Sequence, residues 1–459
     1  MIAIFIGSSS WQRCSRLSSV NKHAQNQSVQ NTTPKDQSAR QILELRLSPK
    51  GIKPVRNGHP WVFRNALGTA PRAAGLPGAV IEMVHAPPLV WHHTRPALAC
   101  DPSGRPLGWG IYNGSSRLAL RMITRNPEIP IRGETFFQLL RDAVDRRENL
   151  RRDHSEGAFR LVFGEADGFP GLVADLLGRT LVLEISSAFA WDNRQWIQEE
   201  LVRLTDPLRV YLAPDREMLR REGVTAPLQG QWSNPQEEGG DARGIVEENG
   251  LSWYALPGTG QKTGFYCDQR ENRRWVAGQA RGLRVLDAFC YHGGFGLTAL
   301  AGGAASVVCA DSSASALQLV EANRDLQQAP AERLHTVRGD LFELLRNNAL
   351  PQGLESFDLV VLDPPKLVPA RQHRDAGLRA YKDLNLVALQ GMRKGGLLVT
   401  FSCSGAISRD DFRTALAWAA ADAGKTVRIE GQFTQGPDHP VPLHFPEAEY
   451  LKGFALRVD

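Results

Sequence analysis

The chain has 459 residues, of which 42% are hydrophobic and 22% charged, and its formal net charge is +5. This length predicts about three domains of roughly 150 residues each, and no apolar run reaches the roughly 18 residues of a transmembrane helix, which excludes membrane-spanning classes. The six scattered cysteines form no Cys-x-x-Cys pair and accompany no zinc-type histidine spacing, so they predict a reduced, cytoplasmic protein without a disulfide framework or structural metal.

Positive charge is gathered near the amino terminus. Residues 41–125 carry 11 Lys and Arg against 3 Asp and Glu, residues 1–40 carry 5 against 1, and residues 126–459 have a net charge of −7. A basic module of this size favours a polyanionic partner, and nucleic acid is the leading candidate. Surface solubility is the alternative reason for the same charge.

Two segments precede the first helical pattern. Residues 1–40 are rich in Ser, Asn and Gln without an amphipathic period, which predicts a disordered tail, with an organelle transit peptide as the alternative. Residues 41–125 contain short strand-like runs separated by turns, which predict a small β-barrel. In its His-Pro-Trp-Val-Phe run, Trp61 and Phe63 are expected in the core, with base stacking as the alternative. The expected strands cover residues 79–84, 97–99, 107–112 and 118–123.

Residues 126–245 change to a mixed α+β pattern. Apolar residues recur at helical spacing across 135–150, which predicts one amphipathic helix, and a turn rich in Gly and acidic residues covers 164–171. Residues 232–244 have the composition of an exposed linker. Four strands are expected at 161–163, 172–175, 181–185 and 208–212, and a second helix is expected at 194–204.

From residue 246 to 459 strands and helices alternate, which predicts an α/β fold with a doubly wound, mostly parallel sheet of seven strands. No helical run separates 427–433 from 450–458, so the last strand is expected to return as an antiparallel hairpin partner. The other strands are expected at 284–289, 306–311, 334–338, 357–362 and 397–402. Helices are expected at 268–280, 314–325, 342–345, 381–392 and 410–421.

Polar residues follow the first strands of this sheet, at the carboxyl edge where open α/β sheets bind ligands. Asp287 precedes a turn that runs through Gly293, and Asp311 ends the next strand. There Asp311 is well placed to hold a ribose diol, with a solvated strand end as the alternative. A carboxylate at Asp287 would repel a pyrophosphate, so it favours a cationic nucleoside such as S-adenosylmethionine (SAM) over NAD. Asp340, after the third strand, is expected either to reach the adenine or to cap the next helix.

Two further runs predict the reaction. Asp363-Pro364-Pro365-Lys366 follows the fourth strand, and Cys403 lies between two serines at the end of the fifth. If these strands are parallel neighbours, Asp363 and Cys403 share one edge of the sheet. A thiolate that adds to C6 of cytosine lets C5 accept a methyl group, with Asp363 bonding the N3 edge and Lys366 supplying positive field to the thiol. The alternative for Cys403 is a small buried core residue.

Ordered motifs run through this half of the chain. They are Lys262-Thr-Gly-Phe-Tyr266, Leu286-Asp-Ala-Phe289, Asp363-Pro-Pro-Lys366, Phe401-Ser-Cys-Ser404, Asp438-His-Pro-Val441 and Tyr450-Leu-Lys-Gly-Phe454. Over the last 200 or so residues the chain resembles the RlmI-type large-subunit ribosomal RNA methyltransferases, which make 5-methylcytosine in 23S RNA. The resemblance extends back to about residue 43 through the runs at 59–63 and 164–171.

The resemblance implies a PUA-type RNA-binding barrel over 41–125, a central α+β domain over 126–245 and a Rossmann-like class I methyltransferase domain over 246–459. It also implies SAM as cofactor, Cys403 as nucleophile and a tendency to dimerise. The substrate is expected to be naked or partly assembled 23S ribosomal RNA, because the base must be extruded. The family's first motif block implies that Lys262, Thr263, Phe265, Tyr266 and Gln269 line the cofactor pocket, with an exposed helix start as the alternative for Gln269. The other expected cofactor contacts are Asp287, Phe289, Tyr291, Gly293, Asp311, Asp340 and Asp363.

The chain departs from the family pattern in three places. His292 stands where the family has Thr, and residues 1–40 have no counterpart. Lys366 stands where other RNA 5-methylcytosine enzymes have a second cysteine, so the base that removes H5 is unassigned, with His439 as one candidate and a structural role as its alternative. A guanine-N7 methyltransferase and a non-catalytic RNA-binding assembly factor are the alternative functions, and turnover in Cys403→Ala separates them.

Overall fold

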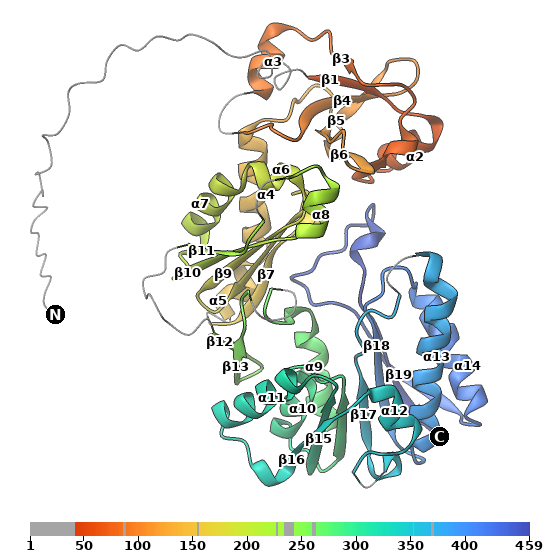
Figure 1. Ribbon diagram of the computed structural model, residues 1–459. Coiled ribbons are helices and arrows are strands. Elements are labelled where there is room, and N and C mark those ends of the chain that lie inside the picture. Colours follow the sequence, from red (N-terminus) through yellow and green to blue (C-terminus); the bar gives the residue numbers. More distant parts are fainter. Residues whose placement is uncertain are drawn as a thin grey trace, which may run out of the picture. The chain divides into compact units, whose positions relative to one another are not determined.

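A computed structural model describes residues 42–85, 89–153, 156–225, 228–233, 243–258, 263–351, 353–368 and 371–459 (Figure 1). Residues Arg40–Asp459 form one compact unit. The tail expected over residues 1–40 and the cofactor contact expected at Lys262 lie outside the described residues. Within the described ranges, none of the helices has the length and hydrophobicity of a membrane span.

The amino-terminal module is a mixed six-stranded sheet with the strand order β2-β6-β5-β4-β1-β3. Strands β4 and β5, which contain the strands expected at 97–99 and 107–112, form an antiparallel hairpin, and β6 follows as the next antiparallel neighbour. Its strands are β1 (Leu43–Arg46), β2 (Trp61–Phe63), β3 (Arg72–Ala73), β4 (Arg95–Cys100), β5 (Pro106–Tyr112) and β6 (Leu118–Thr124), and its helices are α2 (Pro49–Arg56) and α3 (Gly78–Val84).

The segment at residues 79–84 is part of helix α3, so the strand expected there is wrong. Val80, Ile81 and Val84 all pack against one hydrophobic core. Their spacing of three and four residues places them on one face of a helix. The run is too short for its period alone to separate a strand from a helix.

Strand β2 corrects the expected core of the same module. The side chain of Phe63 is 49% exposed and Trp61 is half-buried, whereas Val62 between them is 1% exposed. Successive strand residues point to opposite faces. The strand therefore turns Val62 into the core and leaves the two aromatic residues toward its outer face.

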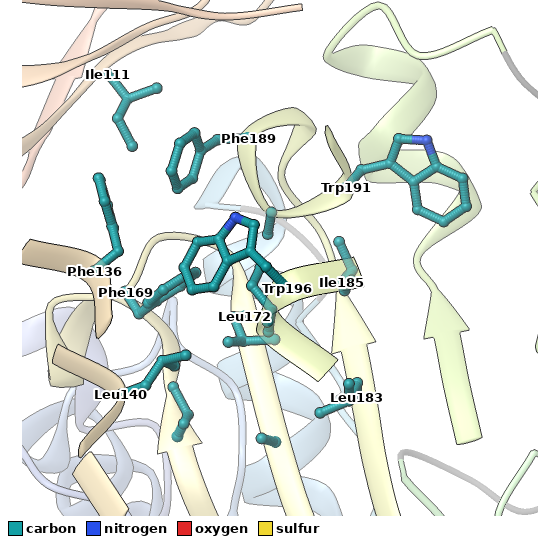
Figure 2. Packing of buried hydrophobic residues seen from close by; sticks show 14 of the residues in the cluster. Ile111, Phe136, Leu140, Phe169, Leu172, Leu183, Ile185, Phe189, Trp191 and Trp196 are labelled. Atoms are coloured by element: carbon teal, nitrogen blue, oxygen red, sulfur yellow. The ribbon is translucent and has the colours of Figure 1, made fainter. Parts of the chain in front are cut away.

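The central domain is a five-stranded sheet in the order β11-β10-β9-β8-β7. Helices pack on it through a core in which the rings of Phe136, Phe169, Phe189 and Trp196 lie 4.7–6.3 Å apart (Figure 2). Its strands are β7 (Ala158–Phe163), β8 (Leu172–Leu177), β9 (Thr180–Ile185), β10 (Arg209–Pro214) and β11 (Gln231–Ser233), and its helices are α4 (Gly133–Asp145), α5 (Glu148–Asp153), α6 (Ala188–Asp192), α7 (Arg194–Thr205) and α8 (Arg216–Arg221).

The single helix expected over 135–150 is two helices, α4 and α5. The break coincides with Arg147, which is 2% exposed. Its guanidinium donates to both carboxylate oxygens of Asp167 at 2.8 Å and to the carbonyl oxygen of Arg160 at 3.0 Å. An amphipathic period carries no information about a buried ion pair to a distant residue, so the sequence did not predict this break.

Strands β12 (Gly244–Glu248) and β13 (Leu251–Ala255) form a hairpin where no strand was expected. Asn249 and Gly250 at its turn have φ values of 55° and 76°. These are the left-handed conformations of a two-residue hairpin turn, which Asn-Gly favours. The signal was therefore present in the sequence, next to the segment expected as a linker.

The carboxyl-terminal domain is a seven-stranded sheet in the order β16-β15-β14-β17-β18-β20-β19. The first five strands in this order are parallel, and β20 runs antiparallel between β18 and β19. This confirms the doubly wound fold and the expected return of the last strand. The strands are β14 (Arg284–Ala288), β15 (Ser306–Asp311), β16 (Leu334–Arg338), β17 (Leu359–Leu362), β18 (Leu397–Ser402), β19 (Val427–Phe433) and β20 (Lys452–Val458).

Helices cover both faces of this sheet (Figure 1). Along β14, Val285 belongs to the hydrophobic core on one face and Leu286 to the core on the other. With both faces covered, ligands can approach the sheet at the carboxyl edge of its parallel strands. The first core takes α9 (Arg270–Gln279), α10 (Gly294–Ala301) and α11 (Ala314–Leu326), and the second takes α12 (Leu341–Arg346), α13 (Arg374–Gly391) and α14 (Arg409–Asp422).

Candidate active site

Three carboxylates gather at the carboxyl edge of the sheet. Asp287, Asp311 and Asp363 lie at the ends of β14, β15 and β17, and β14 pairs with both of the other strands. The negative charges of Asp363 and Asp311 both act on Asp287. The fold therefore brings these three predicted residues together.

Asp287 is buried under the first turn of α10 and is 1% exposed. Its Oδ2 accepts a hydrogen bond from the backbone N–H of Gly296 at 2.8 Å, whereas Oδ1 has no hydrogen-bond partner among the described residues. Burial, reinforced by the charges of Asp363 and Asp311, raises the pKa of Asp287 to about 7. A buried carboxyl group with an unused oxygen suits a cationic ligand. The sulfonium and ammonium groups of SAM fit this requirement.

The loop after β14 has an unusual backbone. Phe289 and Tyr291 have φ values of 63° and 49°, and Gly293, which precedes α10, has a φ of 78°. Left-handed conformations cost non-glycine residues on the order of 1–3 kcal/mol and cluster at ligand sites. The N–H of Tyr291 donates to Oδ2 of Asp311 at 3.0 Å. This bond fixes the loop to the end of the next strand.

The segment before α9 brings Gln269 to the same edge. Nε2 of Gln269 donates to Oδ2 of Asp363 at 3.0 Å, and Nδ2 of Asn272 holds Oε1 of Gln269 at 2.6 Å. Burial raises the pKa of Tyr266, and the nearby charges that raise it further include those of Asp363 and Cys403. Tyr266 therefore lies within electrostatic reach of both predicted catalytic groups.

Two residues of this segment that were expected to contact the cofactor are buried and contact other parts of the protein. Thr263 is 1% exposed, and its hydroxyl donates to Oδ2 of Asp175 in the central domain at 2.6 Å. Phe265 is 2% exposed, and its ring lies 5.1 Å from that of His292. These contacts hold the segment in place rather than presenting the two side chains to solvent.

His292, where the chain departs from the family pattern, lies in an aromatic enclosure. It is 4% exposed, and the rings of Trp253, Phe265 and Tyr266 lie 5.5, 5.1 and 6.5 Å away. Neither ring nitrogen has a hydrogen-bond partner among the described residues. Burial, followed by the charge of Arg273, lowers the pKa of His292 to about 3, so the ring is neutral at physiological pH.

Within the described residues, two predicted residues form no hydrogen bond or ion pair with this cluster. Oδ1 of Asp340 accepts hydrogen bonds from the N–H groups of Phe342 and Glu343 at 2.9 and 3.2 Å, so the capping alternative is the observed one. Lys366 is exposed and makes no hydrogen bond or ion pair with the described residues. In the same ranges no cluster of His, Cys, Asp and Glu is arranged to hold a metal ion.

Cys403 follows β18 and is half-buried, whereas the other cysteines of the described residues are buried. Strands β17 and β18 are parallel neighbours with Leu362 opposite Thr400. Asp363 and Cys403 therefore emerge at one edge of the sheet, as the sequence predicts.

Lys452 is a functional candidate that sequence reasoning missed. It begins β20 opposite Ser402 of β18, is 2% exposed, and donates from Nζ to the carbonyl oxygen of Ser404 at 2.9 Å. Burial lowers the pKa of Lys452 to about 8. Its membership of the Tyr-Leu-Lys-Gly-Phe motif was visible in the sequence, but its position beside Cys403 depends on the pairing of β18 with β20.

Buried hydrogen bonds join the segment after β19 to the central domain. Asp438 is 1% exposed, and its carboxylate accepts from Arg270 at 3.1 Å and from the N–H of Arg160 at 3.0 Å. Arg147 donates to the carbonyl oxygen of Asp438 at 2.8 Å. Nδ1 of His439, the candidate base, lies 3.2 Å from the same carboxylate, and this residue is 3% exposed. This environment favours the structural alternative for His439.

Comparison with known proteins gives matches to both halves of the chain. Residues 227–430 match a family described as S-adenosylmethionine-dependent methyltransferase, and residues 45–86 match a PUA-like domain. Ribosomal RNA large subunit methyltransferase I of Escherichia coli strain K12 is 35% identical over 419 residues, which cover 91% of this chain and 99% of that protein. The same enzyme of Escherichia coli O1:K1 has the same identity and coverage.

Solved structures share the fold. A Streptococcus mutans protein described as a SAM-dependent methyltransferase has a TM-score of 0.72 at 18% identity, over 90% of this chain and 100% of that one. A methyltransferase structure complexed with SAH has a TM-score of 0.73 at the same identity and coverage.

Proposed function

We propose, from the premise that this chain belongs to the ribosomal RNA large subunit methyltransferase I family, that it methylates C5 of a cytosine in 23S ribosomal RNA in the cytoplasm. The observation that carries the proposal is the half-buried Cys403 at the carboxyl edge of the sheet, next to the strand that ends in Asp363. Methylation of a ring carbon needs a nucleophile that activates the ring, whereas methylation of guanine N7 does not.

SAM is the cofactor of this fold family. In this proposal the buried carboxyl group of Asp287, whose Oδ1 has no hydrogen-bond partner among the described residues, balances the positive groups of SAM, and Asp311 at the end of β15 accepts from its ribose. Gln269 and Asp363, which are hydrogen-bonded to each other, complete the edge. When bound, SAM supplies the electrophilic methyl group that C5 of the activated ring takes up, and it leaves as S-adenosylhomocysteine.

The chain's own residues activate and release the base. The Cys403 thiolate adds to C6, which forms a carbon–sulfur bond and moves electron density to C5. In its protonated form Asp363 donates to the N3 edge of the ring, and the hydrogen bond from Gln269 fixes the direction of this carboxyl group. After C5 is methylated, loss of H5 as a proton returns the electron pair that expels the thiolate and restores the ring.

The basic module is proposed to hold the RNA. Residues 41–125 carry a net charge of +8, and part of this region matches a PUA-like domain. Phosphate contacts would position the RNA, while the target base is extruded toward Cys403. Extrusion is easiest in naked or partly assembled RNA. The family resemblance also leads us to propose a homodimer, which sedimentation of the purified chain tests.

The reaction products test the function directly. Purified protein is incubated with methyl-labelled SAM and unmodified 23S RNA, and the digested nucleosides are identified by mass spectrometry. We expect label in 5-methylcytidine, and we expect Cys403→Ala to lose about three orders of magnitude or more in rate while still binding SAM and RNA. Cys100→Ala, which changes a buried cysteine of the amino-terminal module, should keep the activity.

Two outcomes would contradict this assignment. Label in 7-methylguanosine would reduce Cys403 to a packing residue. RNA binding without any label would favour a non-catalytic assembly factor.

A further inference from the structure

A buried lysine lies beside the candidate nucleophile without a carboxylate partner. Lys452 is 2% exposed, and its Nζ has one hydrogen bond, to the carbonyl oxygen of Ser404. Within the described residues, no carboxylate is close enough to Nζ to form an ion pair. Lysine is almost never fully buried unless it is paired. Its burial at this position therefore calls for a group that balances the charge.

Strand pairing determines where this charge lies. Strand β20 is antiparallel to β18, so its first residue lies at the carboxyl edge of β18, where Cys403 follows. The hydrogen bond from Lys452 reaches the residue directly after Cys403. After burial, which lowers the pKa of Lys452, the negative charge of Cys403 has the largest effect on this pKa and raises it.

The other charged neighbours of Lys452 are already matched. Glu449 pairs with Arg409 at 2.8 Å, and Asp411 pairs with Arg374. Tyr381 contributes a hydroxyl that lies 3.0 Å from Oγ of Ser404 and is neutral at physiological pH, because burial raises the pKa of Tyr381. The Cys403 thiol is the remaining neighbour that can become an anion next to Lys452.

We propose that the ammonium group of Lys452 is the positive charge that stabilises the Cys403 thiolate, the role expected of Lys366 from the sequence. Lys452 acts through Cys403 and is therefore a positioning residue. It keeps its proton while the thiolate's electron pair forms the bond to C6. When that bond breaks, the same positive charge again stabilises the released thiolate. The consequence for catalysis rests on the proposed function, whereas the effect on the thiolate does not.

The side chain of Lys452 carries its positive charge at physiological pH. Since burial lowers the pKa of Lys452 to about 8, the side chain is mainly protonated at pH 7 and becomes neutral as the pH rises above that value. The stabilisation of the thiolate is thus present at pH 7. Lys366 is exposed, so water screens its charge from the thiol more strongly.

Alkylation of Cys403 tests the proposal without RNA. The rate of its reaction with iodoacetamide is measured against pH in the full-length protein, by mass spectrometry of the peptide that contains Cys403. In Lys452→Met, which keeps an unbranched side chain but removes the charge, we expect the rate at pH 7 to fall about tenfold or more and the pH midpoint to rise. Lys452→Arg should restore most of the rate because it restores the charge.

Matched variants distinguish the effect of Lys452 on the Cys403 thiol from that of Lys366. Lys366→Met should leave the alkylation profile unchanged, as should Lys394→Met, which alters an exposed lysine before the amino end of β18. With RNA, Lys452→Met should lower kcat at pH 7 and leave KM for RNA unchanged. If Lys452→Met does not fold, Lys452→Gln is used, since it keeps a donor for Ser404.

Three outcomes would overturn the proposal. They are an unchanged alkylation midpoint in folded Lys452→Met, slower alkylation in Lys366→Met but not in Lys452→Met, and no rescue by Lys452→Arg. Failure of the proposed function has a different signature. Wild-type protein would then make no 5-methylcytidine, although its alkylation profile still depended on Lys452.

Discussion

At the scale of single residues, burial decides what the ionisable groups of the site can do. Asp287 and Lys452 are both almost fully buried. Burial raises the pKa of Asp287 to about 7 and lowers the pKa of Lys452 to about 8, so both values lie near physiological pH. Each is therefore sensitive to a charge that arrives nearby, which is the cationic ligand for Asp287 and the thiolate for Lys452. Lys366, by contrast, is exposed, and its position next to two prolines does not bring its charge into the cluster.

The pH dependence of SAM binding should report on Asp287. Because its pKa is about 7, the carboxyl group ionises as the pH rises from about 6 to about 7.5, and we expect the affinity for cationic SAM to increase over this range. Asp287→Asn keeps an acceptor for the N–H of Gly296. It should bind SAM about tenfold more weakly at the upper pH and lose the pH dependence. Calorimetric titration checks both results, and equal affinities would contradict the assignment.

Asp287 has the opposite effect on the stability of the ligand-free protein. The folded state keeps this proton up to a pKa of about 7, against a reference value of 3.8. Between those values the unfolded state binds fewer protons, so this group's contribution to the free energy of unfolding falls as the pH rises. Asp287→Asn should therefore gain stability relative to wild type between pH 4 and pH 7.5, as measured by urea unfolding at several pH values.

At the scale of elements, the site depends on which strands become neighbours. Parallel pairing of β17 with β18 brings Asp363 and Cys403 to one edge, and antiparallel pairing of β18 with β20 adds Lys452. The segment between β19 and β20 is held by Asp438, which is buried among three arginines of the central domain and α9. The segment that leads into the strand of Lys452 is thus anchored by a buried charge network.

Removal of the Asp438 charge should destabilise the fold. Burial opposes the ionised form, but the interactions with His439, Arg270 and the N–H of Arg160 lower the pKa of Asp438 to about 2. Its contribution to stability is present above the reference value of 3.8 and is lost as the pH falls toward about 2. Asp438→Asn leaves Arg270 buried without this counter-charge and should cost about 3–5 kcal/mol.

Urea unfolding at neutral pH measures this loss. Asp383→Asn, at an exposed position on α13, is the matched control and should change the free energy of unfolding by no more than about 0.5 kcal/mol. Equal stability of the two variants would show that the buried network does not anchor the segment.

At the scale of the whole molecule, charge is distributed unevenly along the chain. The amino-terminal module of residues 41–125 is strongly basic, whereas residues 126–459 have a net charge of −7. Since electrostatic attraction to phosphates is independent of base sequence, the basic module would supply affinity and the edge of the seven-stranded sheet would supply the chemistry. The two contributions should be separable by mutation.

Two exposed lysines of α2 test this division. Lys50→Gln with Lys53→Gln should weaken RNA binding and reduce the slope of log affinity against log salt by about 1.4, at roughly 0.7 per phosphate contact on single-stranded RNA. SAM binding should not change. Filter binding at several salt concentrations measures the slope, with Lys394→Gln as the control. An unchanged slope in the double variant would place the RNA on another surface.

Local sequence patterns were enough to predict the fold class and to bring most residues of the proposed site to one edge of the sheet. The alternation of apolar strands with helices from residue 246 onward predicted the doubly wound sheet, since the period of apolar residues follows directly from which faces are buried. Asp287, Asp311, Asp363 and Cys403 were found because residues at the carboxyl ends of parallel strands meet at one edge. Short segments were less certain, as the helix at 79–84 shows, because a few apolar residues fit two periods.

The charges that surround the proposed site became visible only in the three-dimensional structure. Three features depend on contacts between segments far apart in the chain. They are the burial of Asp287, the bonds from Arg147 to Asp167 and to the carbonyl oxygen of Asp438, and the approach of Lys452 to Cys403. The order β18-β20-β19 places the last strand inside the sheet rather than at its edge. Local patterns do not encode such neighbours, because sequence periodicity reports which face of an element is buried but not what it is buried against.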